Sequence, residues 1–396
     1  MSSSETAEAQ RVGRRVRLDE RVSPLELFFD LVFVFALTQV TALMADEPTW
    51  EGLAKGMLVL AALWWAWGAY AWLTNYINAD EGRERLLMLG SMAAMLVAAL
   101  AVPHAFTTDA VLFGCAYAVV RWLHIFIWAE ANEAVDTAGA IRRLSRTALP
   151  GPALLILAGF LDGAAQGALW VVALAIDFSG PYVFGVHGFR VSAGHFAERF
   201  GLIVIIALGE SIVAIGVGAE DIDLTARVVI AAVLGVVLSA AMWWAYFDVV
   251  APSAERRFSQ SRGYERLRIA RDSYSYLHLP MIAGIILVAL GIKKTIGEVD
   301  EPLGTVPAVA LLGGVAVYYG AHVAFRLRNM GTINGQRLAA AILCVALIPL
   351  ATEVDALVAL ALVAAIAASV IAYEATHFAE ARAAVRRRRA EEAARS

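Results

Sequence analysis

The sequence is a succession of apolar runs, each about as long as a helix that crosses a membrane. Such a helix needs about 20 mainly apolar residues at a rise of about 1.5 Å per residue. Of the 396 residues, 60% are hydrophobic and only 17% are charged. A water-soluble chain of this length cannot bury so much apolar surface. The sequence therefore predicts an all-α polytopic membrane protein that has the lipid bilayer as its main partner.

About twelve runs qualify as transmembrane helices. They are 24–44, 54–77, 86–103, 110–130, 148–162, 166–186, 196–218, 226–250, 269–292, 304–326, 337–352 and 355–376. The runs 148–162 and 337–352 are short, and the sequence leaves open whether they cross fully. The first run contains Glu26, Asp30 and Gln39, so it is too polar for a secretory signal and is interpreted as a spanning helix.

The distribution of Lys and Arg predicts the orientation, because short cytoplasmic loops carry an excess of both. With the N-terminus inside, most of the 32 Lys and Arg residues fall in cytoplasmic segments, Arg199 among them. The segments 1–22 and 379–396 become basic cytoplasmic tails, and the acids Asp46 and Asp300 fall outside. Both termini are therefore expected in the cytoplasm.

The two halves of the sequence resemble each other. The tryptophan pair at 64–65 corresponds to the pair at 243–244, each inside a predicted helix. Both pairs are interpreted first as packing residues and second as cavity lining. This similarity predicts two six-helix repeats, 23–188 and 189–378, and six is an even number, so the repeats would be parallel. The alternative to a repeat is chance similarity between short apolar segments.

The first helix carries two carboxylates one turn apart. Ser23, Pro24 and Glu26 form a capping box with proline at the first helical position, which gives Glu26 a structural explanation. Asp30 lies on the same face, and two charged carboxylates at this spacing repel each other. Asp30 is thus a candidate proton or cation site, and a partner arginine on a neighbouring helix would explain it equally well.

Glu210 lies near the middle of the predicted helix 196–218. An unpaired carboxylate at the bilayer centre costs about 2.5–3.5 kcal/mol, so Glu210 is expected to face the protein interior and to be protonated or paired. Ser211 can share a hydrogen bond with it, and Gln39 is its counterpart in the first repeat. His195 and Glu198 at the start of this helix are interpreted as interfacial.

Arg121 in the helix 110–130 needs a carboxylate if it is buried, and Glu210 is the expected partner. Such a pair is either an ion-pair switch or a fixed structural link. A second polar group is expected from Asp177, Asp248 and the start of the helix 269–292. The candidate binding residues are Asp30, Gln39, Arg121, His124, Asp177, Glu210, Ser211, Asp272, Tyr276, His278 and His322.

Several function classes lack a motif. The two cysteines, Cys115 and Cys344, each lie in an apolar run and are interpreted as small buried hydrophobes. No nucleophile–base pattern, phosphate loop or metal-ligand spacing is visible, so no catalytic residue, cofactor or metal is predicted. Nucleic acid is not an expected partner, because basic residues flanking membrane helices are explained by topology.

Three sequence segments together resemble those of a known family. They are the run from Glu26 to Val34, the run from Gly201 to Ile212, and the Trp243-Trp244 pair. They resemble the low temperature requirement protein A (LtrA) family over roughly residues 15–380. The resemblance implies a multipass protein of the bacterial inner membrane linked to growth in the cold, and it supplies no reaction or ligand.

The sequence favours a secondary transporter of an unknown small solute or ion that uses intramembrane carboxylates. A non-transporting membrane stress or assembly protein is the main alternative. A haem-binding bundle that uses His124 and His322, or a membrane enzyme, is a weaker one.

Overall fold

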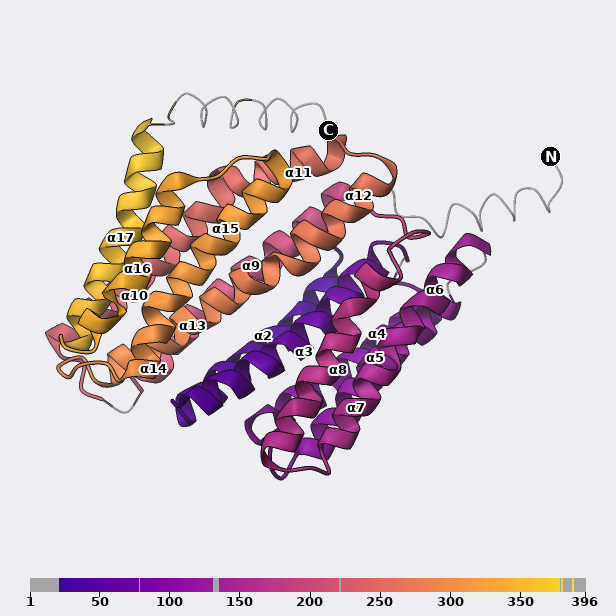
Figure 1. The fold of residues 1–396 in the computed structure, drawn as a ribbon, viewed down its shortest axis with the longest axis horizontal. Coiled ribbons are helices and arrows are strands. Elements are labelled where there is room, and N and C mark those ends of the chain that lie inside the picture. The colour runs from indigo at the N-terminus through magenta and orange to yellow at the C-terminus, as the bar shows by residue number, and fades with distance from the viewer. Residues whose placement is uncertain are drawn as a thin grey trace. The chain divides into compact units, whose positions relative to one another are not determined.

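The structure is a computed structural model that describes residues 21–77, 79–130, 135–220 and 222–377, together with positions 379 and 387 (Figure 1). Nearly all of this chain is helical. The basic tails predicted at 1–22 and 379–396 lie almost wholly outside the described residues.

The helices follow one another with short connections. The first half contains α2 (Pro24–Asp46), α3 (Trp50–Thr74), α4 (Gly82–Ala101), α5 (Ala110–Glu130), α6 (Val135–Ala148), α7 (Pro150–Ala158) and α8 (Gly163–Val183). The second half contains α9 (Ala193–Gly218), α10 (Ala226–Ala245), α11 (Ala251–Gln260), α12 (Gly263–Ile269), α13 (His278–Gly297), α14 (Thr305–Ala308), α15 (Gly314–Met330), α16 (Gly335–Ala351) and α17 (Ala356–His377).

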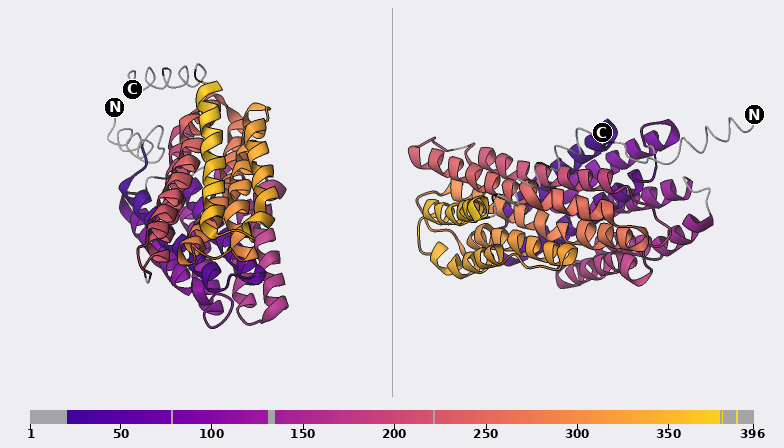
Figure 2. Two further views of the ribbon diagram at one scale, coloured as in Figure 1. Left: turned by 90° about the vertical axis from the view of Figure 1, so that its left-hand side faces the viewer. Right: turned by 90° about the horizontal axis from the view of Figure 1, so that it is seen from above.

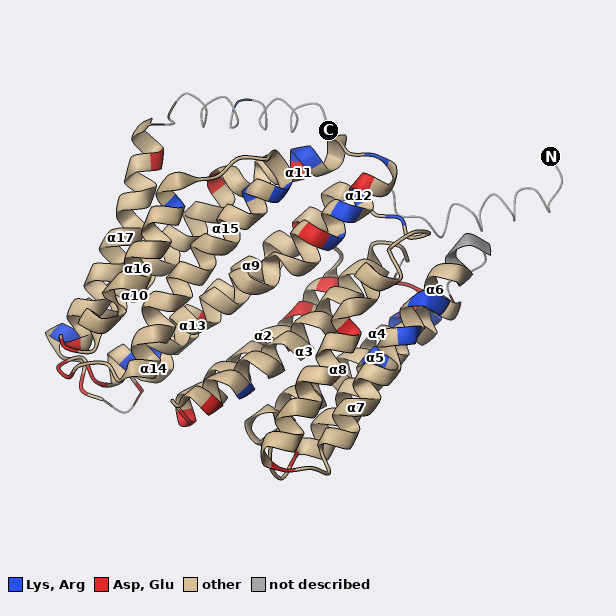
Figure 3. Ribbon diagram, viewed as in Figure 1, with Lys and Arg blue, Asp and Glu red and all other residues tan. Residues whose placement is uncertain are grey.

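Ten helices within the described residues are long and apolar enough to cross a membrane. Charged side chains occupy few positions along them, and the ribbons in Figure 3 are tan over most of their length. The fold is therefore that of an all-helical multipass membrane protein. The two predicted spans outside this set of ten are 148–162 and 337–352, whose full crossing the sequence left open. The second of these runs is α16, an apolar helix of 17 residues.

The predicted span 148–162 is divided differently in the structure. Its apolar part is α7, which has only nine residues. At about 1.5 Å per residue this helix is much shorter than the roughly 30 Å hydrocarbon core. Proline has no N–H and disfavours a helical conformation in the residue before it, which explains the break between α6 and Pro150.

Three of the long spans contain a π-helical turn. These turns are Tyr246–Val250 between α10 and α11, Ala270–Tyr276 between α12 and α13, and Val309–Gly313 between α14 and α15. A π-turn adds a residue to one helical turn and rotates the side chains that follow it, and such turns are frequent at functional sites. Tyr246 and Ser273, which lie in two of these turns, both contact His278.

The chain divides into two compact units. Unit 1 contains the described residues of 1–40, 57–199 and 261–271, and unit 2 those of 41–56, 200–260 and 272–396. In unit 1, α5 packs against α4 and α7; in unit 2, α15 packs against α13 and α16 (Figures 1 and 2). This division into compact units does not test the parallel repeats, which stay a prediction.

The two tryptophan pairs have different surroundings. Trp64 and Trp65 are buried in unit 1, as expected for packing residues. Trp243 and Trp244 on α10 are 46% and 42% exposed. The packing interpretation therefore fits the first pair and not the second.

Candidate functional site

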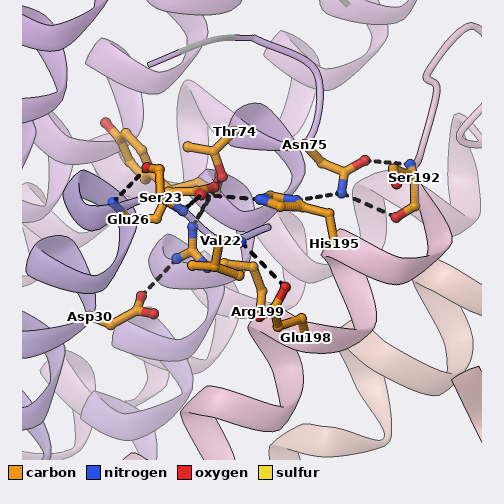
Figure 4. A network of polar contacts seen from close by, with 11 residues as sticks. Val22, Ser23, Glu26, Asp30, Thr74, Asn75, Ser192, His195, Glu198 and Arg199 are labelled. Carbon is orange, nitrogen blue, oxygen red and sulfur yellow. Dashed lines mark hydrogen bonds and ion pairs between the residues drawn. The ribbon is translucent and has the colours of Figure 1, made fainter. Parts of the chain in front are cut away.

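Two helix faces in unit 1 bring four ionisable side chains together. Glu26 and Asp30 are four residues apart on α2, and His195 and Arg199 are four residues apart on α9. Residues at this spacing share one helix face. All four side chains are buried (Figure 4). We call these four residues the α2–α9 cluster.

The capping box positions the first carboxylate, as the sequence predicted. The Ser23 N–H donates to Glu26 Oε2 at 2.8 Å, and the Glu26 N–H donates to Ser23 Oγ at 3.3 Å. Proline at position 24 begins the helix. Glu26 does more than cap α2, because the same carboxylate also accepts hydrogen bonds from α9.

Arg199 is fully buried and links both carboxylates. Its guanidinium donates to Glu26 Oε1 at 3.0 Å and to Asp30 Oδ1 at 2.7 Å. Thr74 Oγ1 accepts a further hydrogen bond at 3.1 Å, and the Trp67 ring lies 5.7 Å from the guanidinium carbon. Trp67 also donates its indole N–H to Asp30 Oδ1 at 2.8 Å. These partners compensate the charge of the buried guanidinium, whose Nε has no hydrogen-bond partner among the described residues.

His195 connects Glu26 to a polar segment that follows α3. Its Nε2 lies 3.1 Å from Glu26 Oε2, and its Nδ1 lies 2.9 Å from Asn75 Nδ2. Asn75 in turn accepts the Ser192 N–H at 2.6 Å and donates to the Ser192 carbonyl at 3.3 Å. The imidazole is therefore held from both sides (Figure 4).

The cluster contains more acid than fixed base. Two carboxylates face one guanidinium, and Asp30 Oδ2 is buried with no hydrogen-bond partner among the described residues. A buried charge without compensation is expensive. The arrangement is thus chemically suited to bind one further positive charge.

The sequence interpretation missed half of this cluster. Arg199 was counted with the cytoplasmic charges and His195 with the interfacial residues, whereas both side chains are buried and contact the carboxylates of α2. The signal was present in the spacing, since positions 195 and 199 repeat the four-residue interval of positions 26 and 30. The partner arginine considered for Asp30 is Arg199.

Arg121 forms a second buried ion pair in unit 1. Its partner is Asp177, at 3.1 Å and 2.6 Å through two guanidinium nitrogens, where the sequence analysis expected Glu210. Tyr117 donates to the same carboxylate at 3.1 Å. Asp177 therefore belongs with Arg121 and not with the second polar group. His124 lies one turn further along α5 and accepts the Trp128 indole N–H at 3.0 Å.

The other residues of the expected second polar group are in unit 2, and so is the separate candidate His322; the group's residues there are Asp248, Asp272, Tyr276 and His278. His278 contacts Tyr246 Oη at 2.9 Å, and Asp272 accepts a hydrogen bond from Arg328 at 3.0 Å. His322 is buried, and its Nδ1 lies 2.9 Å from the Tyr318 carbonyl. Tyr276 is half-buried. Asp272 and His278 thus each have a polar partner within unit 2.

Glu210 is 2% exposed and Ser211 is fully buried, so neither side chain faces lipid. Burial of Glu210 agrees with the expected interior position, and its functional role stays a prediction. Gln39, the proposed counterpart in the first repeat, is half-buried.

These features define a multipass membrane protein with buried charge clusters. The sequence model of the bacterial low temperature requirement A protein (LtrA) family matches residues 21–372, and the chain belongs to this family. It is 31% identical over 309 residues to the uncharacterized protein RA0937 of Rhizobium meliloti (strain 1021), with 74% of each chain covered. No solved structure matches the chain.

Proposed function

We propose that this LtrA-family protein is a secondary transporter of a small solute or ion, and that the α2–α9 cluster is its ion-coupling site. The observation that carries the proposal is that two buried carboxylates face a single guanidinium. In addition, Oδ2 of Asp30 has no hydrogen-bond partner among the described residues. Ionisable groups inside spanning helices are expensive and are characteristic of ion pathways and proton relays. Carriers also place coupling sites within their helix bundles.

The setting of the transporter is part of the proposal. We place it in the bacterial inner membrane with both termini in the cytoplasm, in support of growth at low temperature. In this account the predicted spans 148–162 and 337–352 complete twelve crossings, arranged as the parallel repeats 23–188 and 189–378. The charge distribution of the loops supports the orientation.

Reconstitution of the full chain tests the transport proposal. Proteoliposomes with a pH-sensitive dye inside would receive sodium chloride, potassium chloride or a mixture of neutral amino acids in separate additions. We expect at least one addition to move protons across the membrane with the wild-type protein and none to do so with Asp30→Asn. No proton movement with any of the three probes would contradict the proposal.

Arg227→Gln is the matched control for loss of an ion pair. Arg227 binds Asp300 and Asp355 at 2.5 Å and 2.6 Å, but its side chain is 44% exposed. Exposed pairs contribute about 0–1 kcal/mol. This variant should keep the proton movement of the wild type, which separates loss of the cluster from loss of any charged side chain.

A further inference from the structure

The hydrogen bonds around Asn75 determine the protonation of His195. The atom that contacts the backbone N–H of Ser192 must be an acceptor, so it is Asn75 Oδ1. Asn75 Nδ2 then faces two acceptors, the Ser192 carbonyl at 3.3 Å and His195 Nδ1 at 2.9 Å. His195 Nδ1 must carry a lone pair to accept this hydrogen bond. The ring proton therefore resides on Nε2, from which it donates to Glu26 Oε2 at 3.1 Å.

This tautomer makes His195 neutral. A doubly protonated ring would place an N–H on Nδ1 against the amide hydrogens of Asn75, 2.9 Å away, and would lose that hydrogen bond. Arg199 is then the single fixed cation of the cluster. α3 and the segment after it contribute only the neutral Trp67, Thr74 and Asn75. The other charged groups of the α2–α9 cluster are therefore the two carboxylates of α2.

The two carboxylates are unequally satisfied. Glu26 accepts hydrogen bonds from the Ser23 backbone, from His195 and from Arg199, and these engage both of its oxygens. Asp30 accepts hydrogen bonds from Trp67 and Arg199 on Oδ1, whereas Oδ2 is buried without a partner in the described structure. Arg199 pairs with both carboxylates, so the oxygen that has no hydrogen-bond partner in the described structure is what distinguishes Asp30 from Glu26.

The chemistry at Oδ2 fits a proton better than a metal cation. Hard metal cations such as Ca²⁺ and Mg²⁺ take about six to eight oxygen ligands. No group of three or more His, Cys, Asp or Glu residues in the described chain could hold a metal ion. The nearby Thr74 hydroxyl already donates to the Tyr70 carbonyl and accepts from Arg199. The guanidinium next to Asp30 would also repel a metal ion.

We propose that Asp30 holds the exchangeable proton of the cluster on Oδ2, and that His195 stays neutral as a positioning residue locked by Asn75. The step is a simple proton equilibrium: the O–H bond of Asp30 breaks to release a proton to water and forms again when a proton binds. This inference deepens the proposed function by naming the proton as the coupling ion, but its test does not depend on transport.

Infrared spectroscopy of the full chain in lipid nanodiscs tests the assignment without a mutation. Protein would be prepared with side-chain carboxyls isotopically labelled either in aspartate or in glutamate. We expect a carbonyl stretch of a protonated carboxylic acid at neutral pH that shifts only with labelled aspartate and disappears in Asp30→Asn. An acid band that shifts with labelled glutamate and disappears in Glu26→Gln would place the proton on Glu26, and the absence of an aspartate band that depends on Asp30 would place it elsewhere; either result overturns the proposal.

His195→Gln supplies an independent check in case Asp30→Asn fails to fold. A glutamine amide can accept from Asn75 through its oxygen and donate to Glu26 through its nitrogen, as the neutral imidazole does, but it cannot titrate. The acid band and its pH dependence should therefore persist in His195→Gln. Their loss would show that protonation of the acid depends on a titrating His195, and would contradict its assignment as a neutral positioning residue. If the wild-type protein shows the acid band but no proton movement in proteoliposomes, the transport proposal is rejected and the assignment to Asp30 stands.

Discussion

At the scale of single residues, the structure separates two kinds of buried ion pair in unit 1. Arg121 and Asp177 form a balanced pair of one cation and one anion, with Tyr117 completing the carboxylate. The α2–α9 cluster is unbalanced, because two carboxylates face one guanidinium. A balanced pair suits a structural link, whereas an unbalanced cluster suits binding of an ion. Variants of the two sites should consequently fail in different ways.

Asp177→Asn is expected to destabilise the fold. The change leaves the Arg121 guanidinium buried without a counter-charge, which costs about 3–5 kcal/mol. Thermal unfolding in detergent should show a marked fall in the unfolding temperature, and the double variant Arg121→Met with Asp177→Leu should recover most of it. Glu130→Gln is the control, because Glu130 pairs with Arg83 at the surface and should change stability by less than about 1 kcal/mol. An Asp177→Asn protein of wild-type stability would refute the structural role.

The sequence identified Asp30 as a candidate site residue and predicted that Glu210 lies in the protein interior. It did not identify Arg199 as the partner of Asp30 or Asp177 as the partner of Arg121. Partners are set by which helices pack together, and a single sequence contains no direct signal for that packing. Arg121 shows the limit most clearly, because Asp177 and Glu210 were both available acids within predicted spans. His195 was missed for another reason: its place near a helix start already had an interfacial explanation.

At the scale of helices, close backbone contact determines how some neighbours pack. A Cβ added at Gly284 on α13 would lie 2.6 Å from the Gly314 carbonyl oxygen on α15, and one added at Gly314 would lie 2.8 Å from the Gly284 carbonyl oxygen. Unit 1 has a similar contact between α5 and α7, where a Cβ at Gly114 would lie 2.8 Å from the backbone of Ile156. Small residues permit such approach, which membrane helices use in place of a hydrophobic driving force.

Gly284→Ala is therefore expected to destabilise unit 2. The added methyl group must push α13 and α15 apart, at a cost of about 1–3 kcal/mol for overpacking. Gly320→Ala on α15 is a matched control, because a Cβ there meets nothing within 4 Å. Thermal unfolding of the two variants in the same detergent should show a lower unfolding temperature for Gly284→Ala alone. Equal temperatures would show that the contact between α13 and α15 is loose.

Long helices were predictable from the apolar runs, whereas their interruptions were only partly so. The proline at position 150 predicts the end of α6. The π-turn at Tyr246–Val250 contains neither proline nor glycine, so local sequence offers no warning of it. This turn nevertheless matters for a polar contact, because Tyr246 at its start contacts His278.

At the scale of the whole molecule, several loops of unit 2 are tied together. Arg227 at the start of α10 binds Asp300 and Asp355, and the backbone N–H of Ala356 donates to the Glu301 carbonyl. Loops that share such bonds must lie on the same side of a membrane. The charge distribution places Arg227, Asp300 and Glu301 outside, so Asp355 is expected there as well.

Cysteine labelling of intact cells checks this orientation. In a background lacking Cys115 and Cys344, a cysteine at Glu301 should react with a membrane-impermeant reagent added outside. A cysteine at the exposed Ser259, in the segment predicted to be cytoplasmic, should react only after the cells are opened. The reverse pattern would invert the topology and every assignment of inside and outside that depends on it.

The central claim is that the α2–α9 cluster binds one exchangeable proton on Asp30, and a proton count tests it most directly. Potentiometric titration of wild-type protein and of Asp30→Asn, both folded in the same unbuffered lipid preparation, measures the difference in protons bound per chain. We expect the wild type to release one more proton than the variant as the pH is raised from neutral. Identical titration curves for the two folded proteins would contradict the account.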